Sequence, residues 1–259
     1  MNAPKRYADT ILVPSMVTDT RDRLTVPGIA KLFEELAWQH ARRLGVDFTD
    51  GGDHFWVLSR LRVQVTSLPA WSQRIDLETW PSGISRLFAC REFRIADENG
   101  TDLIRGTSRW LVMSASSGRP VPPGRALDVN LIPTTPAVLD EEPEKLSPEE
   151  SAQALSRVVV RYGDLDRNRH TNNTRYAVWM LDTLPPEVLE DHVVTDFDMN
   201  FTAESHYGDE LTVMATPIED AYRGTTLEYR SHLLRDRDGA VVAVGRFTLS
   251  PAPAHGSTS

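Results

Sequence analysis

Cysteine is almost absent from this chain of 259 residues, which contains a single one, Cys90. One thiol cannot form an internal disulfide, and no Cys/His cluster has the spacing of a zinc site, so disulfide-rich and zinc-stabilised domains are excluded. No apolar run approaches the roughly 20 residues that a membrane-spanning helix needs. The opening MNAPKRYADT also lacks the apolar core of a signal peptide. We therefore expect a cytoplasmic protein with no membrane partner.

Basic residues are in deficit, because 28 Lys and Arg stand against 37 Asp and Glu and give a net charge of −9. This balance argues against nucleic acid as the main partner, and any acidic partner needs a local basic patch. Hydrophobic residues at 40% and charged residues at 25% exclude a disordered, collagenous or coiled-coil chain. The length exceeds the usual single core of about 100 to 150 residues. We expect two domains or one doubled domain.

The first half of the chain combines one amphipathic helix with alternating strands. Residues 27–45 place apolar side chains at helical spacing, begin with Pro27 and stop at Gly45. Alternation of apolar and polar residues then predicts four antiparallel strands, near 60–65, 73–80, 86–96 and 102–113. An Asn99-Gly100 turn joins the last two strands, and a short strand at residues 9–16 precedes the helix.

The second half repeats this order. A helix at residues 172–184 is ended by Pro185-Pro186. A short strand precedes it at 156–162, and four strands follow at 196–201, 209–217, 224–235 and 240–249, with a hairpin at Asp238-Gly239. A sheet wrapped around a long helix, twice in one chain, is the pattern of an α+β tandem (double) hotdog fold.

The segment between the halves, residues 116–150, is rich in proline and acidic residues, which is typical of a linker. We therefore expect an N-terminal hotdog domain at residues 1–115, this linker, and a C-terminal hotdog domain at residues 151–259. An unrelated pair of α+β domains is the alternative.

The segment YGDLDRNRHTNN, residues 162–173, leads into the second helix. It carries an acid, an amide and an imidazole at alternate positions, so Asp166, Asn168 and His170 can share one pocket. Candidate N-cap residues follow at Thr171, Asn172 and Asn173. Because a helix N-terminus favours developing negative charge, this place suits hydrolysis of an acyl group through an oxyanion.

Comparison of the two halves indicates where the chemistry lies. An offset of about 145 between the helices sets the three polar residues opposite Arg21, Arg23 and Thr25. An offset of about 136 between the next strands sets Glu204 opposite Leu68. The first half has a residue of a different chemical type opposite each polar candidate. We therefore expect one active site per chain, in the second half.

Two motifs carry a resemblance to a known family. The first is Asp166-x-Asn168-x-His170 followed by Asn172-Asn173 and Tyr176; the second is Pro69-Ala70-Trp71-Ser72 before a strand ending in Thr79-Trp80. With the stretches 55–120 and 158–211 around them, they resemble the acyl-ACP thioesterases of plants and bacteria. This resemblance implies a double-hotdog hydrolase that cleaves the thioester between a fatty acyl chain and acyl carrier protein (ACP), ending chain elongation.

The resemblance implies a catalytic set of Asp166, Asn168, His170 and Glu204. Possible supporting residues are Ser205, Asn172 and Asn173. Plant members usually have a cysteine directly after the glutamate, where this chain has Ser205. We therefore expect direct attack by water: Glu204 and His170 take the proton, Asn168 and helix-start N–H groups hold the thioester oxygen, and Asp166 orients His170 or Asn168. Asp166 as the base and Ser205 as a nucleophile are alternatives.

Each of these residues also has a non-catalytic interpretation. Asp166 and Asn168 are common turn formers, and His170 and Glu204 taken singly fit a helix entry and a strand end. Asp166, His170 and Glu204 could also ligate a metal, but three-ligand sites normally draw on more histidine or cysteine. We expect no metal and no cofactor.

The resemblance places the acyl chain in the first half, between helix and sheet. Candidate pocket residues are Leu32, Phe33, Leu36, Trp38, Trp56 and Leu58, although apolar residues at helical spacing usually form core. ACP is acidic and needs positive charge to dock. Candidate docking residues are Arg157, Arg161, Arg167, Arg169 and Arg175, with a solvated arginine face as the alternative. Both a monomer and a homodimer fit.

Three other functions stay open. One is a hotdog thioesterase for acyl-CoA or a polyketide carrier, and another is a non-catalytic acyl-binding sensor, which would lack polar residues in both halves. A hotdog dehydratase would need a histidine and an acid from the two halves, and Thr25 and Leu68 stand where the first half would supply them.

Overall fold

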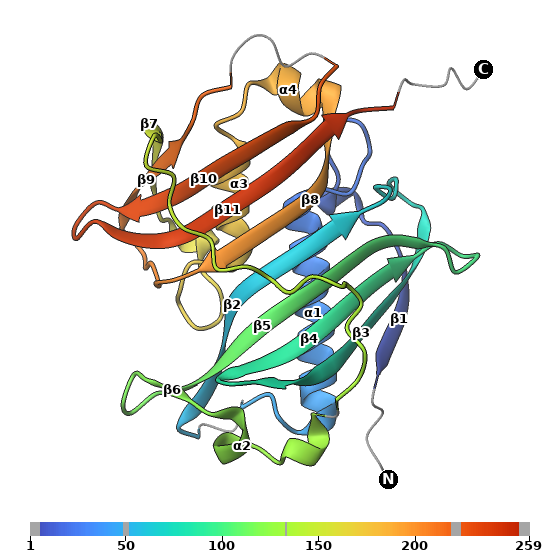
Figure 1. The fold of residues 1–259 in the computed structure, drawn as a ribbon, viewed down its shortest axis with the longest axis vertical. Coiled ribbons are helices and arrows are strands. Elements are labelled where there is room, and N and C mark those ends of the chain that lie inside the picture. Colours follow the sequence, from blue (N-terminus) through green and yellow to red (C-terminus); the bar gives the residue numbers. More distant parts are fainter. Residues whose placement is uncertain (1–5, 49–51, 133, 219–223, 254–259) are drawn as a thin grey trace. The chain divides into compact units, whose positions relative to one another are not determined.

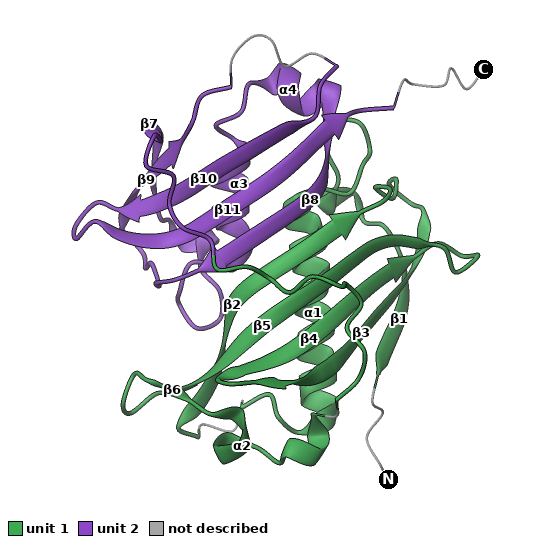
Figure 2. Cartoon of the chain, viewed as in Figure 1, with its two compact units in different colours: residues 1–145 green, residues 146–259 purple. Residues whose placement is uncertain are grey.

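A computed structural model describes residues 6–48, 52–132, 134–218 and 224–253 of the chain (Figure 1). The chain divides into two compact units, residues 1–145 and 146–259 (Figure 2). Each unit is an antiparallel sheet with a helix packed against it, so the predicted double hotdog fold is confirmed. Within the described ranges, no helix is both long enough and apolar enough to span a membrane.

Unit 1 has the predicted order of one strand, one long helix and a run of strands. Its elements are β1 (Tyr7–Leu12), η1 (Ser15–Val17), α1 (Val26–Leu44), β2 (His54–Val65), β3 (Arg74–Ser85), β4 (Phe88–Ala96) and β5 (Asp102–Ser114). The strands lie side by side in the order β1-β3-β4-β5-β2, and the short β6 (Pro120–Val121) pairs with β5. The first strand starts two residues earlier than residue 9, where the alternation places it.

The helix α1 is held at both ends and along one face. The Thr25 hydroxyl accepts the N–H of Gly28 at 3.1 Å, and Gly45 ends the helix at φ +68°. Phe33 is 2% exposed and stacks on Phe93 of β4 with ring centroids 4.3 Å apart. A Cβ on Gly106 of β5 would lie 2.5 Å from the Phe33 ring, so glycine there lets helix and sheet approach closely.

The proline-rich segment at residues 116–150 contains short elements of its own, α2 (Pro123–Ala126) and η2 (Val129–Leu131). Further along it, the carboxylates of Glu141 and Glu142 form ion pairs with Arg62 and Arg109 of the unit 1 sheet. This part of the segment is therefore attached to unit 1 up to the unit boundary after Lys145.

Unit 2 repeats the arrangement of unit 1. Its elements are β7 (Gln153–Val159), η3 (Tyr162–Asp164), α3 (Asn173–Leu181), α4 (Pro186–Asp191), β8 (His192–Phe201), β9 (Glu210–Ala215), β10 (Leu227–Arg235) and β11 (Ala240–Pro251). The strand order β7-β9-β10-β11-β8 matches that of unit 1 element by element. The helix α4 was not predicted: Pro185-Pro186 closes α3, but Pro186 also opens a new helix because proline suits a first helical turn.

Candidate active site

The segment between η3 and α3 is a tight turn built on the carboxylate of Asp166. Its Oδ1 accepts the backbone N–H of Asn168 at 2.8 Å and that of His170 at 3.1 Å. The Asp166 N–H donates to the carbonyl of His170 at 2.8 Å. Arg169 takes up the reversal with φ +64°, a conformation uncommon for a residue other than glycine. Asp166 thus fixes the backbone of the two residues predicted to act beside it.

Unit 1 contains the same turn. Oδ1 of Asp19 accepts the N–H groups of Arg21 and Arg23, each at 2.9 Å. The offset between the turns is 147, from Asp19 to Asp166, and the N-cap residues Thr25 and Asn172 share it. The predicted offset of about 145 is therefore wrong by two residues.

The corrected register changes the comparison of the halves. Asp166 has an acidic counterpart, contrary to the prediction that every polar candidate lacks one, whereas Asn168 and His170 lie opposite Arg21 and Arg23. The isolated bridges Arg23–Ala70 and His170–His206 match each other, and Glu204 therefore stays opposite Leu68 as predicted. The turn is common to both units, and the amide, imidazole and carboxylate belong to the second copy.

The imidazole of His170 faces the segment that joins β8 to β9. Its Nε2 lies 3.4 Å from Oε2 of Glu204, and the two side chains are 29% and 44% exposed. A backbone bridge between His170 and His206 holds the two segments side by side. The structure thus brings together the predicted imidazole and carboxylate at a place that water reaches.

Ser205 follows Glu204 directly in the sequence, but its side chain points inward. It is fully buried, and its hydroxyl lies 2.6 Å from the Thr171 hydroxyl and 2.9 Å from that of Tyr176. Its carbonyl accepts the Thr171 N–H at 2.8 Å. Burial raises the pKa of Tyr176, which keeps this hydroxyl protonated. The Ser205 hydroxyl therefore connects the segment between β8 and β9 to Thr171 and to Tyr176 of α3. Because this oxygen is inaccessible, it does not suit a nucleophile.

The start of α3 has fewer available N–H groups than predicted. The Asn172 N–H donates to the carbonyl of Asp164 at 2.8 Å, and the N–H groups of Thr174 and Arg175 both donate to Asn172. Among the described residues of the first helical turn of α3, only Asn173 has a backbone N–H without a protein acceptor. The amide side chain of Asn168 is exposed and makes no hydrogen bond to another described residue. These two groups are the donors that remain for a thioester oxygen.

His206 also belongs to the site, although it was not predicted from the sequence. Its Nε2 lies 4.0 Å from Oε2 of Glu204, and its ring meets that of His170 edge-on with centroids 5.1 Å apart. The ligand atoms of His170, Glu204 and His206 all lie within 4.8 Å of one another. No sequence motif marks His206, because its place depends on the bridge to His170.

The five predicted docking arginines differ in their surroundings. Arg157, Arg161, Arg167 and Arg169 are exposed. Arg175 is half-buried, with its Nε 2.7 Å from Oδ1 of the buried Asp164. Arg175 of α3 is therefore held against η3, at the start of the turn segment, by its ion pair with Asp164.

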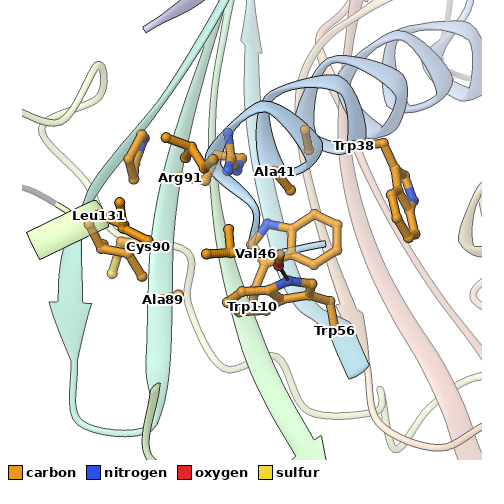
Figure 3. A pocket seen from close by; sticks show the side chains of 13 residues that line it. Trp38, Ala41, Val46, Trp56, Ala89, Cys90, Arg91, Trp110 and Leu131 are labelled. Carbon is orange, nitrogen blue, oxygen red and sulfur yellow. Dashed lines mark hydrogen bonds between the residues drawn. The ribbon is translucent and has the colours of Figure 1, made fainter. Parts of the chain in front are cut away.

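Unit 1 contains a partly open, mostly apolar cavity between α1 and the sheet (Figure 3). Trp38 and Trp56 line it as predicted, and the indole N–H of Trp56 is fixed by the carbonyl of Val46 at 2.7 Å. The other four predicted pocket residues do not line it. Three of them are buried core, namely Phe33, Leu36 and Leu58, and Leu32 lies elsewhere on α1.

Two residues of β4 bring polar chemistry to this cavity (Figure 3). Nη1 of Arg91 lies 3.1 Å from both Nδ1 of His40 and the Thr79 hydroxyl, and burial lowers the pKa of Arg91 to about 10. Arg91 therefore stays cationic at neutral pH. Burial raises the pKa of Cys90, which disfavours the thiolate that a cysteine nucleophile needs.

Comparison with known proteins agrees with this arrangement. The acyl-ACP thioesterase N-terminal domain matches residues 4–122, and the acyl-ACP thioesterase C-terminal domain matches residues 147–247. The chain is 27% identical to a chloroplastic acyl-acyl-carrier-protein hydrolase of Cuphea viscosissima over 242 residues, which cover 88% of this chain and 58% of that protein. It therefore spans less than two thirds of the length of this relative.

Solved structures share the fold across nearly the whole chain. The 12:0-ACP thioesterase from Umbellularia californica has a TM-score of 0.84 at 22% identity, covering 96% of this chain and 98% of that one. An acyl-ACP thioesterase from Bacteroides thetaiotaomicron has a TM-score of 0.83 at 24% identity, covering 95% and 98%. Because the two family domains together match most of the sequence, the chain belongs to the acyl-ACP thioesterase family.

Proposed function

We propose that this chain hydrolyses the thioester of fatty acyl-ACP, releasing a free fatty acid and ACP and so ending chain elongation. The observation that carries the proposal is the His170–Glu204 pair, with 3.4 Å between Nε2 and Oε2, in the unit that the thioesterase C-terminal domain matches. Both side chains are accessible to water, the second substrate of a hydrolysis.

In the proposed reaction, Glu204 takes a proton from water as the oxygen attacks the thioester carbonyl. The Asn168 amide and the Asn173 N–H donate to the oxyanion. Glu204 then hands this proton to Nε2 of His170, 3.4 Å away. As the C–S bond breaks, His170 passes it to the leaving sulfur, so that the hydroxyl of water ends in the carboxylic acid and the transferred proton in the thiol. Asp166 acts as a positioning residue, because its carboxylate holds the backbone N–H groups of Asn168 and His170.

The proposed substrate consists of an acyl chain and an acidic carrier protein, and each part has a candidate binding surface. The cavity of unit 1 has the mostly apolar lining that an acyl chain needs, with Trp38 and Trp56 in its wall. The exposed arginines that run from β7 to the turn fit an acidic carrier protein; they are Arg157, Arg161, Arg167 and Arg169. The cytoplasmic location and the choice between monomer and homodimer stay predictions, which cell fractionation and light scattering would test.

Release of free thiol from a panel of acyl-ACPs and the matching acyl-CoAs tests the function, with wild type and His170→Ala compared. We expect cleavage of acyl-ACP well ahead of acyl-CoA, and loss of turnover in a variant that stays folded. Preference for acyl-CoA would mean that the acyl group is carried by CoA and not by ACP, with the same hydrolysis. Binding of acyl chains without any cleavage would overturn the proposal in favour of an acyl-binding sensor.

A further inference from the structure

Three side chains with metal-binding atoms converge beside the turn. Oε2 of Glu204 lies 3.4 Å from Nε2 of His170 and 4.0 Å from Nε2 of His206. All three ligand atoms lie within 4.8 Å of one another, so one ion could contact them after small side-chain rotations. Glu204 and His206 are 44% and 47% exposed, which gives an ion access from solution.

A fourth side chain prepares His206 for this role. Oδ2 of the buried Asp209 accepts the backbone N–H of His206 at 2.9 Å and lies 4.0 Å from its Nδ1. Asp209 therefore lies on the Nδ1 side of the His206 ring, and the Nε2 of the same ring faces Glu204. Metal-binding histidines are commonly oriented by such a carboxylate. Asp209 is itself held by Arg237, at 3.1 Å from its Oδ1.

The ligand types indicate a divalent transition metal. Two imidazoles and one carboxylate form a three-residue set that zinc uses, with a further position left for water. The set predicted from sequence, Asp166, His170 and Glu204, contains only one histidine, and no metal was expected there. The structure replaces Asp166, whose Oδ1 is used by the turn, with a second imidazole from His206. The corresponding positions of unit 1 are Arg23, Leu68 and Ala70, which are not metal ligands.

We propose that His170, Glu204 and His206 bind a divalent transition metal, with Zn²⁺ as the best match, and that the bound ion inhibits the enzyme. The ion would occupy the His170 lone pair and the Glu204 carboxylate, the two groups that move the proton in the proposed hydrolysis. The inhibitory part rests on the proposed function, and metal binding itself does not.

Titration of the metal-free full-length chain with Zn²⁺, against a fluorescent zinc indicator, tests the site directly. We expect one ion per chain in wild type and a loss of affinity of at least ~10-fold in both His206→Ala and Glu204→Gln. Asp209→Asn should weaken binding by about 10- to 100-fold. His54→Ala, at the start of β2 in unit 1, is the matched control and should bind as wild type does. Unchanged affinity in His206→Ala, or no saturable binding in wild type, would overturn the site.

Initial rates of acyl-ACP cleavage, with Zn²⁺ and after chelation, test the inhibition. Zinc should abolish turnover, a chelator should restore it, and the zinc concentration for half inhibition should follow the affinities measured in the titration. Full activity at saturating zinc would overturn the inhibitory role and leave the metal site standing. If the metal-free chain cleaves no thioester, the proposed function and the inhibition fail together, and the titration still decides whether the metal binds.

Discussion

Nε2 of His170 lies 3.4 Å from Oε2 of Glu204, and neither side chain is buried. Because the proposed hydrolysis needs both groups, Glu204→Gln and His170→Ala should each lower kcat by about 10² to 10⁴-fold. Their melting temperatures should stay close to that of wild type, since exposed side chains contribute little to stability. Steady-state kinetics on acyl-ACP and thermal denaturation measure the two effects.

Glu228→Gln is the control for this pair, because it removes another exposed carboxylate of unit 2, on β10. It should change neither kcat nor melting temperature. The double variant His170→Ala/Glu204→Gln should be little worse than the poorer single variant, because residues that act as a unit are not additive. Fully additive losses would contradict joint action of the pair.

Asp166 is expected to act through the backbone of the turn. Asp166→Asn keeps a side-chain oxygen that can accept both N–H groups, so its kcat should stay within about 10-fold of wild type. Asp166→Ala removes the acceptor and should lower both kcat and the free energy of unfolding, the latter by about 1 to 2 kcal/mol. If Asp166 were the general base, the asparagine variant would be as inactive as the alanine variant.

Asp19→Ala separates the turn from the chemistry. It removes the same acceptor in unit 1, where Oδ1 of Asp19 holds the N–H groups of Arg21 and Arg23. We expect a comparable loss of stability, about 1 to 2 kcal/mol in urea unfolding, with kcat unchanged for the folded fraction. A fall in kcat as large as that of Asp166→Ala would contradict the assignment of the chemistry to the second copy.

Ser205→Ala should lower the stability of the protein more than it lowers kcat. The substitution leaves the buried hydroxyls of Thr171 and Tyr176 with one partner fewer, which costs about 1 to 3 kcal/mol of stability. The folded enzyme should retain most of its kcat, because the Ser205 hydroxyl is inaccessible. Complete loss of turnover in a folded variant, or an acyl group found on Ser205 by mass spectrometry, would point to a nucleophile instead.

The unit 1 cavity should set the length of the acyl chain. Ala89→Leu adds volume to a residue of β4 that lines the cavity, so the preferred acyl-ACP should become shorter. Leu32→Ala is the control, because Leu32 does not line the cavity although the sequence places it there. Rates across a series of chain lengths measure the preference, and equal shifts in both variants would exclude this cavity as the acyl site.

Cys90 should behave as an inert thiol. Burial raises its pKa, so the thiolate forms only at higher pH than in an unstructured peptide. The rate of alkylation by iodoacetamide should therefore be slow at neutral pH, and its midpoint should shift upward from that of a free cysteine. Cys90→Ala should keep its kcat. Fast alkylation at neutral pH accompanied by inactivation would contradict this role.

Periodicity was enough to predict the principal strand and helix of each unit, the four strands that follow, and their order, but not the short elements α2 and α4. The helix expected at residues 27–45 is α1, Val26–Leu44, because a long buried stripe and strong end signals leave little freedom. Short elements were placed less well: the strand expected at residues 156–162 is β7, Gln153–Val159, since the residues after it form η3.

The site was predictable where it is contiguous in sequence. The spacing of Asp166, Asn168 and His170 is visible in one segment, whereas the contribution of His206 depends on pairing between segments. The assignment of the chemistry to the second half was also predictable, but the equivalence of the two turns was not. Aligning the helices by sequence gave the wrong offset, and the hydrogen bonds of Asp19 and Asp166 identified the equivalent turns.

The turn that both units share is a scaffold onto which chemistry can be transplanted. In unit 1 it already has the aspartate acceptor, the capped helix start and the bridge from Arg23 to Ala70. The combined substitutions Arg21→Asn, Arg23→His and Leu68→Glu would install there the side chains that the second copy carries. In a protein with two copies of one domain, the copy without the active site therefore retains a backbone on which a second site can arise while the first continues to work.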